Sequence, residues 1–143
     1  MTELTLEAAR KMLDAGLAHA RANNMNPLGL VILDARGALK ASAMEDGTSL
    51  MRWKVAFGKA FGAVAWGVGS RKLAGMAAER PQFMAAASHI AEAGLIPVAG
   101  GVLIRDAHGK LLGGFGVSGD TSDNDELVAS AGIAAAGLVA DGG

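Results

Sequence analysis

The sequence predicts an α+β fold in which helices cover an antiparallel sheet. Two segments are predicted β-hairpins, because in each an apolar stretch leads into an Asp-Ala-x-Gly tetrapeptide and a second extended stretch follows. Segments with apolar residues at helical spacing precede, separate and follow these hairpins. Since hairpins build antiparallel sheets and helices must cover them, the expected order is helix, hairpin, three helices, hairpin, helix.

The first helix is expected over residues 4–23. Leucine and alanine recur along one side of this segment, and charged residues occupy the other side. Thr5 is predicted to cap its N-terminus, since a hydroxyl can accept a hydrogen bond from the first turn. Asn23, Asn24 and Pro27 are expected to end it.

The first hairpin is predicted to begin with an unbroken apolar run, which is typical of a strand covered on both faces. In both hairpins the turn has Asp in its first position and Gly in its fourth, as a tight turn favours. The expected segments are strands 28–33 and 38–44 around the turn 34–37, and strands 101–105 and 110–118 around the turn 106–109.

Three helices are expected between the hairpins and one after them. Hydroxyl side chains supply the start signal for three of these helices, and proline supplies it for the other. Acidic residues after the last start suit the positive N-terminus of a helix. The predicted segments run from Thr48 or Ser49 to about Trp66, over 71–80 with Ser70 as cap, from Pro81 to about Gly94, and from Thr121 or Ser122 to the chain end.

Composition excludes several classes of protein. The 143 residues suit one domain, and more than a third of them are alanine or glycine, so backbones are expected to pack closely. There is no apolar run long enough for a membrane span and no basic, apolar leader, which predicts a cytoplasmic protein. The absence of cysteine excludes disulfides and thiolate sites. A net charge of -1 argues against a nucleic-acid partner.

Residues 114–119 match the glycine pattern G-x-G-x-x-G of dinucleotide-binding proteins. That function needs a βαβ unit, and here the last helix is expected to end the chain without a second strand. Close packing of a strand against a helix is therefore the favoured interpretation of the glycines. Helix capping likewise explains the nearby acidic residues better than metal binding, because they lack the spacing of a calcium loop. These acidic residues are Asp120, Asp123, Asp125 and Glu126.

Small residues gather in the helix that ends near Trp66. They permit close packing of this helix on the sheet, or on another helix at a subunit interface. A homo-oligomer is the favoured interpretation, and the glycines and alanines of the last helix permit similar contacts. The small residues are Ala56, Gly58, Ala60, Gly62 and Ala63.

Histidine offers one candidate ligand for a haem iron. Small side chains surround His89 at helical spacing, which leaves room for a flat macrocycle beside a neutral imidazole. The alternative is that His89 is simply a partly exposed helix residue. His108 is expected in a solvated turn, and His19 on the flank of the first helix, so no zinc pair is predicted. The small neighbours of His89 are Ala85, Ala86 and Ala93.

Candidates for acid–base catalysis are few. Lys54 and Lys59 flank the helix rich in small residues, and a lysine desolvated in such a crevice can act as a base. A carboxylate would complete the proton transfer, and Asp46, Asp125 and Glu126 are the candidates. The alternative function is therefore a cofactor-free tautomerase, isomerase or lyase of small-molecule catabolism that uses a pocket between subunits.

Several motifs carry a family resemblance. The most specific is Gly-Gly-Phe-Gly-Val-Ser-Gly at 113–119, followed by the pair at 125–126, and Lys-Ala-Phe at 59–61 adds to it. With these motifs, nearly the whole chain, residues 4–140, resembles the GlcG/HbpS family, which includes the C-terminal domain of PduO-type proteins. Weaker motifs lie at 4–9, 31–34, 44–47 and 96–104.

The resemblance implies a profilin-like fold with a five-stranded antiparallel sheet and assembly into rings or octamers. It also implies binding of haem or a related tetrapyrrole, because some members of the family bind haem. The segment 79–89 lies where members vary most, and it is expected to line the pocket. His89 is the leading candidate for iron ligation, followed by Met84 and His19. Phe83 and Lys59 are further candidate ligand-binding residues.

Overall fold

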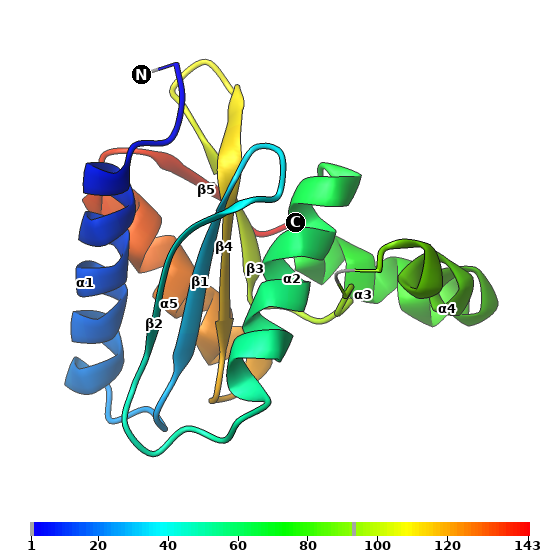
Figure 1. Cartoon of the computed structure of the whole chain (residues 1–143), viewed down its shortest axis with the longest axis horizontal. Helices are drawn as coiled ribbons and strands as arrows, with labels where there is room; N and C mark the ends of the chain where they lie inside the picture. The colour runs from blue at the N-terminus through cyan, green and yellow to red at the C-terminus, as the bar shows by residue number, and fades with distance from the viewer. Residues whose placement is uncertain (1, 93) are drawn as a thin grey trace.

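The computed structural model describes residues 2–92 and 94–143. These residues form five helices and a five-stranded antiparallel sheet with strand order β2-β1-β4-β3-β5 (Figure 1), which confirms the predicted α+β class. The elements are α1 (Leu6–Ala22), β1 (Gly29–Asp34), β2 (Leu39–Met44), α2 (Arg52–Trp66), α3 (Ser70–Glu79), α4 (Pro81–Ile90), β3 (Gly101–Arg105), β4 (Leu111–Ser118), α5 (Ser122–Ala135) and β5 (Val139–Asp141).

Both predicted hairpins are confirmed, and their turns have the same geometry. In the β1–β2 turn the Gly37 N–H donates to the Asp34 carbonyl at 3.0 Å, and in the β3–β4 turn the Gly109 N–H donates to the Asp106 carbonyl at 3.1 Å. Both glycines have φ near +85° (87° and 85°), in the left-handed region where glycine is favoured. The shared Asp-Ala-x-Gly pattern therefore encodes one turn used twice.

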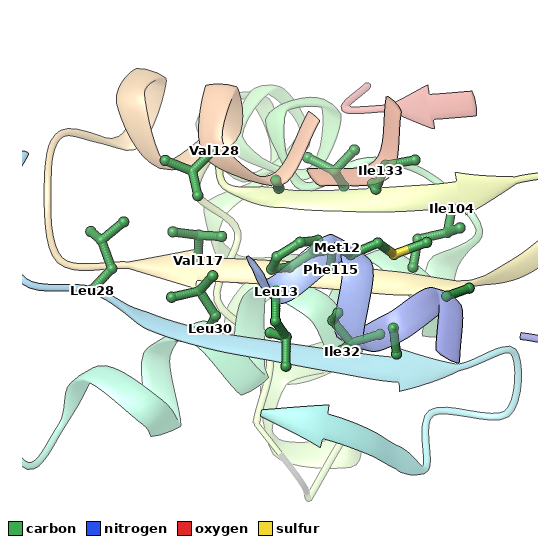
Figure 2. Packing of buried hydrophobic residues seen from close by; sticks show 14 of the residues in the cluster. Met12, Leu13, Leu28, Leu30, Ile32, Ile104, Phe115, Val117, Val128 and Ile133 are labelled. Atoms are coloured by element: carbon green, nitrogen blue, oxygen red, sulfur yellow. The ribbon is translucent and has the colours of Figure 1, made fainter. Parts of the chain in front are cut away.

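The sheet has a different helix layer on each face. Helices α1 and α5 pack together on one face, and α2 packs on the other (Figure 1). The face under α1 and α5 carries large side chains that form the main core, with the Phe115 ring at its centre (Figure 2). This core includes Met12, Leu13, Leu28, Leu30, Ile32, Ile104, Phe115, Val117, Val128 and Ile133.

The face under α2 carries Val31, Leu33 and Leu103, but where the helix crosses β4 it has glycine instead of a large side chain. A Cβ at Gly116 would overlap the carbonyl oxygen of Ala56, and one at Gly114 would lie 2.7 Å from a methyl group of Val64. The helix backbone therefore lies directly on the strand, which confirms the close packing expected of these glycines. The part of α2 around Gly62 also packs against the same chain, because a Cβ at Gly62 would lie 3.1 Å from the side chain of Leu95. Small residues here build the fold rather than a subunit interface.

The last strand is missing from the order predicted by residue patterns. We expected the final helix to end the chain, and this was wrong, because Val139–Asp141 forms β5 beside β3. Three residues are too few to show an alternating pattern, and Gly137 (φ +75°) turns the chain back after the helix. β4 and β5 are each antiparallel to β3, so they run parallel to one another, and β4, α5 and β5 form a βαβ unit with β3 inserted between its strands. The glycines of the motif are covered by the backbone of α2, as at Gly116 against Ala56, so they serve packing here rather than the approach of a pyrophosphate.

Three of the predicted helix starts are confirmed. The Thr5 hydroxyl accepts a hydrogen bond from the Ala8 N–H at 3.1 Å, and the Thr121 hydroxyl accepts one from the Asn124 N–H at 3.1 Å. Pro81 is the first residue of α4, where its missing N–H loses no helical hydrogen bond.

Two helix starts were predicted wrongly. α2 begins after Met51 without a side-chain cap, rather than at Thr48 or Ser49. The N-cap of α3 is Gly69, and Ser70 is the first residue of the helix. The Ser70 hydroxyl is buried and serves the polar cluster described below, so tertiary structure uses the group that the local pattern assigned to capping.

Helix α4 differs from the rest of the molecule. It packs against α3, projects away from the sheet (Figure 1), and buries only Met84. Its exposed residues include Ile90, at 82% exposure. The helix ends at Ile90 rather than near Gly94, and Ala93 lies outside the described residues. Within the described part of the chain, no helix combines the length and apolar character needed to cross a membrane.

Candidate functional site

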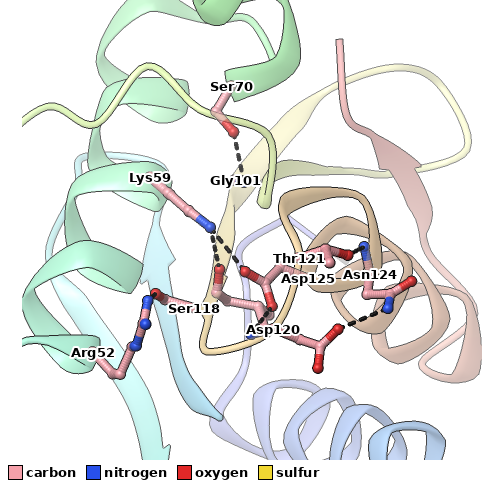
Figure 3. Close-up of polar contacts among 10 residues, drawn as sticks. Arg52, Lys59, Ser70, Gly101, Ser118, Asp120, Thr121, Asn124 and Asp125 are labelled. Atoms are coloured by element: carbon pink, nitrogen blue, oxygen red, sulfur yellow. Dashed lines mark hydrogen bonds and ion pairs between the residues drawn. The ribbon is translucent and has the colours of Figure 1, made fainter. Parts of the chain in front are cut away.

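A buried ion pair links the two helix layers across the sheet. Lys59 on α2 is 3% exposed, and its Nζ lies 3.1 Å from Oδ2 of Asp125 on α5. Nζ also donates to the Val117 carbonyl on β4 at 2.9 Å (Figure 3). The structure thus brings together one of the three predicted lysine–carboxylate pairs.

Further polar contacts extend from this pair into the loop between β4 and α5. Asp125 Oδ1 accepts a hydrogen bond from the Asp120 N–H at 3.0 Å. Asp120 in turn accepts a hydrogen bond from the Asn26 N–H at 2.9 Å. It accepts another from the Asn124 amide at 2.7 Å (Figure 3). The acidic residues at the start of α5 therefore act as hydrogen-bond acceptors for the loop and the helix.

Two more contacts fix the surroundings of the ion pair. The Ser70 hydroxyl accepts a hydrogen bond from the Gly101 N–H at 2.6 Å, and Arg52 donates to the Ser118 hydroxyl at 3.1 Å (Figure 3). Gly100 must be glycine, because its φ is +121° and a Cβ there would lie 2.8 Å from Lys59 Nζ. Ala or any larger residue at position 100 would displace the lysine.

Burial lowers the pKa of Lys59, and Asp125 opposes this effect by favouring the charged ammonium. Every buried side-chain polar atom among the described residues has a hydrogen-bond partner. Neither Lys59 nor Asp125 lines any of the four hollows on the surface described here. The arrangement can hold α2, β4 and α5 together, and both side chains of the pair are buried away from solvent.

The other two candidate carboxylates lie apart from Lys59. Asp46 is exposed and lines a hollow of about 420 Å³ with Arg21 and Glu45. Glu126 accepts a hydrogen bond from Arg71 Nε at 2.9 Å, close to the surface. Neither residue is placed to exchange a proton with the lysine.

An apolar hollow of about 470 Å³ lies between α2 and α4. The Trp66 and Phe83 rings meet edge to face there, with centroids 5.9 Å apart. Arg80 places its guanidinium carbon 4.4 Å from the centroid of the Phe83 ring. The hollow is lined by Phe61, Ala65, Trp66, Phe83, Ala86, Ala87, Ile90, Ala91 and Leu95.

The predicted haem ligands fall in three different environments. Phe83 lines the hollow, and His89 is exposed on α4 one residue before the hollow-lining Ile90. Met84 is buried between α3 and the loop that follows α4, in a cluster with Leu73 and Leu95. His19 lies on α1, across the sheet from α2 and α4.

Lys54, the second candidate lysine, lies beside another hollow. This hollow measures about 350 Å³, and its lining also includes Met51, Trp53 and Phe57. The Lys54 ammonium lies 5.7 Å from the Trp53 ring centroid, so it is a surface cation stacked on an aromatic ring. Among residues 2–92 and 94–143, no three or more His, Cys, Asp or Glu side chains are grouped to hold a metal ion.

The sequence did not single out Phe61 and Trp66, which line the apolar hollow, or Arg80, which lies beside it. Phe61 and Trp66 come from α2, which was interpreted from its small residues alone. Arg80 belongs to the segment 79–89 expected to line the pocket, but no periodic pattern distinguishes it at this helix junction. The aromatic residues could have been found from their spacing, since Phe57 and Phe61 are four residues apart and share one helix face.

Known proteins resemble this chain over nearly its whole length. A family model described as haem degrading protein HbpS-like matches residues 4–134. A double mutant of HbpS from Streptomyces reticuli is 31% identical, with a TM-score of 0.80 over 94% of this chain and 87% of that chain. PduOC in complex with haem is 24% identical, with a TM-score of 0.85 over 95% of this chain and 96% of that chain. No curated protein matches the chain.

Proposed function

The chain belongs to the family of HbpS-like haem-degrading proteins, and on that premise we propose that it binds haem, or a closely related tetrapyrrole, in the apolar hollow between α2 and α4. HbpS is the relative at 31% identity, and PduOC shares the fold and forms a complex with haem. The single observation that carries the proposal is the hollow itself, because its lining matches the chemistry of a flat apolar macrocycle.

The size and lining of the hollow support this ligand. At about 470 Å³ it falls within the range of small-molecule sites, roughly 300–1,000 Å³. Ala86 and Ala87 leave the wall of α4 flat, so a planar ring can approach the helix closely. Phe61, Trp66 and Phe83 offer aromatic rings for stacking, which gives an apolar ring specific partners as well as burial.

We propose His89 as the axial ligand of the haem iron. His89 is exposed on the same helix as the hollow-lining Phe83 and next in sequence to Ile90, and imidazole is a common haem ligand. Met84 is a weaker candidate because its thioether is already packed in a buried cluster. His19, on the opposite side of the sheet, could reach this hollow only from another copy of the chain.

We further propose that the protein is a cytoplasmic homo-oligomer, and an octamer is the form that the family resemblance implies. Apolar side chains of α4 and of the start of α2 are exposed together with the two apolar hollows, and such surfaces mark interaction sites. They include Leu50 at 80% exposure, Trp53 at 43% and Ile90 at 82%. A second copy would shield these side chains from water and close the open side of the haem site.

Light scattering tests this assembly. Ile90→Asp is expected to lower the mass of the particle, whereas Leu127→Asp, at an exposed position on α5, is expected to leave it unchanged. A monomeric wild-type protein would contradict the oligomer.

A cofactor-free enzyme is the second candidate function, and the Lys59–Asp125 contact is the observation that favours it. A lysine whose pKa is lowered by burial can act as a base when substrate reaches it. The pair is closed to the four hollows described above, so this function requires an opening movement. Reductive trapping of a carbonyl substrate on Lys59 would support it, and protection of Lys59 from small amine-reactive reagents would argue against it.

Titration of the apoprotein with haemin tests the proposed function. We expect a shifted Soret band at one haem per chain, lost or moved in His89→Ala and unchanged in His108→Ala, which removes an exposed histidine of the β3–β4 turn. Ala86→Phe should fill the hollow and weaken binding, whereas Ala85→Phe adds the same ring to the same helix outside the hollow lining. An unshifted Soret band, or equal effects of the two alanine variants, would contradict the proposal.

A further inference from the structure

Arg80 is held at the junction of α3 and α4 by backbone contacts on both sides. Its N–H donates to the Met76 carbonyl of α3 at 2.8 Å, and its carbonyl accepts from the Met84 N–H of α4 at 3.1 Å. The residue is at once the C-cap of α3 and the N-cap of α4. Its side chain therefore leaves a fixed backbone rather than a free loop.

The guanidinium of Arg80 is positioned over a ring that lines the haem site. Its carbon lies 4.4 Å from the centroid of Phe83, which is within the range of a cation–π contact. The same ring meets Trp66 edge to face, so Phe83 is held from a second direction. The cation thus lies one aromatic ring away from the apolar hollow.

The donors of Arg80 are not used by the protein. Arg21, Arg71 and Arg105 each bind a carboxylate, whereas Arg80 forms no ion pair and no side-chain hydrogen bond within residues 2–92 and 94–143. A planar guanidinium offers a fork of N–H groups that matches a carboxylate. The guanidinium of Arg80 is held beside an apolar site and has no carboxylate partner among the described residues. It can therefore bind an anionic group of the ligand.

From these contacts we propose that Arg80 binds a carboxylate of the tetrapyrrole and makes the site selective for ligands with free carboxylates. The inference rests on the proposed function, since it concerns the same hollow. The nine lining residues carry no charged side chain, so only the apolar part of the ligand belongs inside. The propionates of haem must then project past the rim, where Phe83 holds the guanidinium of Arg80.

Haemin and its dimethyl ester, titrated into the full-length protein, test the inference. The ester keeps the macrocycle and the iron but lacks the two carboxylates. We expect the wild-type protein to bind haemin about fivefold more tightly than the ester, the upper end of what an exposed ion pair supplies. Arg80→Gln should reduce haemin affinity to the level of the ester and leave ester affinity unchanged.

A matched variant and a salt series complete the test. Arg10→Gln removes an exposed arginine of α1 that also forms no ion pair among the described residues, and it should leave both affinities unchanged. Added salt should weaken haemin binding in the wild-type protein more than in Arg80→Gln, because salt screens an exposed ion pair. If Arg80→Gln leaves haemin affinity unchanged, or lowers the affinities for haemin and the ester equally, the inference about Arg80 is overturned while the proposed function stands. Failure of the wild-type protein to bind haemin overturns the proposed function and the inference with it.

Discussion

Two regions of this molecule use small residues in opposite ways. In the body, which comprises the sheet with α1, α2 and α5, glycine and alanine mark the points where backbones touch, as Gly116 does against Ala56. In the arm, which comprises α3 and α4, Ala86 and Ala87 line an open hollow, and a Cβ at Gly75 would meet nothing within 4 Å. The same composition therefore produces dense packing in one region and free space for a ligand in the other.

Breaking the buried ion pair of the body should have the largest effect. Lys59→Met leaves the Asp125 carboxylate buried without its counter-ion and removes a donor from the Val117 carbonyl. Removing one partner of a buried pair typically costs about 3–5 kcal/mol. We expect a loss of this order in the free energy of unfolding, measured by urea denaturation with circular dichroism.

Two variants test whether burial causes that loss. Lys59→Met combined with Asp125→Asn should be more stable than Lys59→Met alone, because no charge remains buried and the Asn oxygen can still accept from the Asp120 N–H. Arg71→Met removes the exposed cation that binds Asp123 and should cost far less. If the single Lys59 variant lost no more stability than Arg71→Met, the pair would not hold the helix layers together.

Adding one methyl group to the body should have the next largest effect. In Gly116→Ala the new Cβ would overlap the Ala56 carbonyl oxygen, which belongs to the backbone of α2 and cannot rotate away. The helix must shift, and overpacking of this kind typically costs about 1–3 kcal/mol. We expect the upper end of that range by urea denaturation. Wild-type stability in this variant would mean that α2 does not lie so closely on β4.

The sequence predicted the fold far better than the site. The hairpins, their Asp-Ala-x-Gly turns and the helix starts at Thr5, Thr121 and Pro81 depend on contacts between near neighbours, which a pattern reveals. The fifth strand, β5, was implied only by the family resemblance, with its five-stranded sheet, because its three residues carry no pattern and pairing with β3 defines it.

For the site, the family resemblance suggested Phe83, and acid–base chemistry suggested that Lys59 works with a carboxylate, but neither could choose among the three carboxylates. That choice depends on residues 66 positions apart, which only the folded chain brings into contact. Arg80 belongs to the segment 79–89 expected to line the pocket, but nothing local distinguished it, since its place over the Phe83 ring is set by the fold at the junction of α3 and α4. Sequence patterns indicate suitable residue types, but they do not show which residues far apart in the chain come together in the fold.

In the arm, adding the same methyl group should raise the free energy of unfolding instead of lowering it. Gly75 is exposed in the middle of α3, and a Cβ there meets nothing within 4 Å. Alanine lowers the conformational entropy of the unfolded chain, so Gly75→Ala should stabilise the helix by about 0.5–1 kcal/mol. Differential scanning calorimetry would show a small rise in the melting temperature. A loss of stability would place the arm among the densely packed regions and remove the contrast with Gly116→Ala.

Lowering the pH should reduce the stability of the body through protonation of Asp120, and this is the smallest of the four predicted effects. The backbone N–H of Asn26, and then the side chain of Asn124, hold the pKa of Asp120 below its usual value. In the window between the folded and unfolded pKa values the unfolded chain binds more protons, so this stabilisation is complete above about pH 4 and is lost as the pH falls further.

Asp120→Asn should therefore lower stability slightly at neutral pH and make the fall in stability below pH 4 shallower. The Asn oxygen can still accept from the Asn26 N–H, but its NH₂ would face the NH₂ of Asn124, so one hydrogen bond is lost. Asp14→Asn, at an exposed carboxylate of α1 with no ion pair in the described part of the chain, should leave the pH profile unchanged. Urea denaturation at several pH values between 3 and 7 compares the three proteins. Because Asp120 ties the loop before α5 to the loop before β1, an unaltered acid limb in Asp120→Asn would mean that acid acts elsewhere in the body.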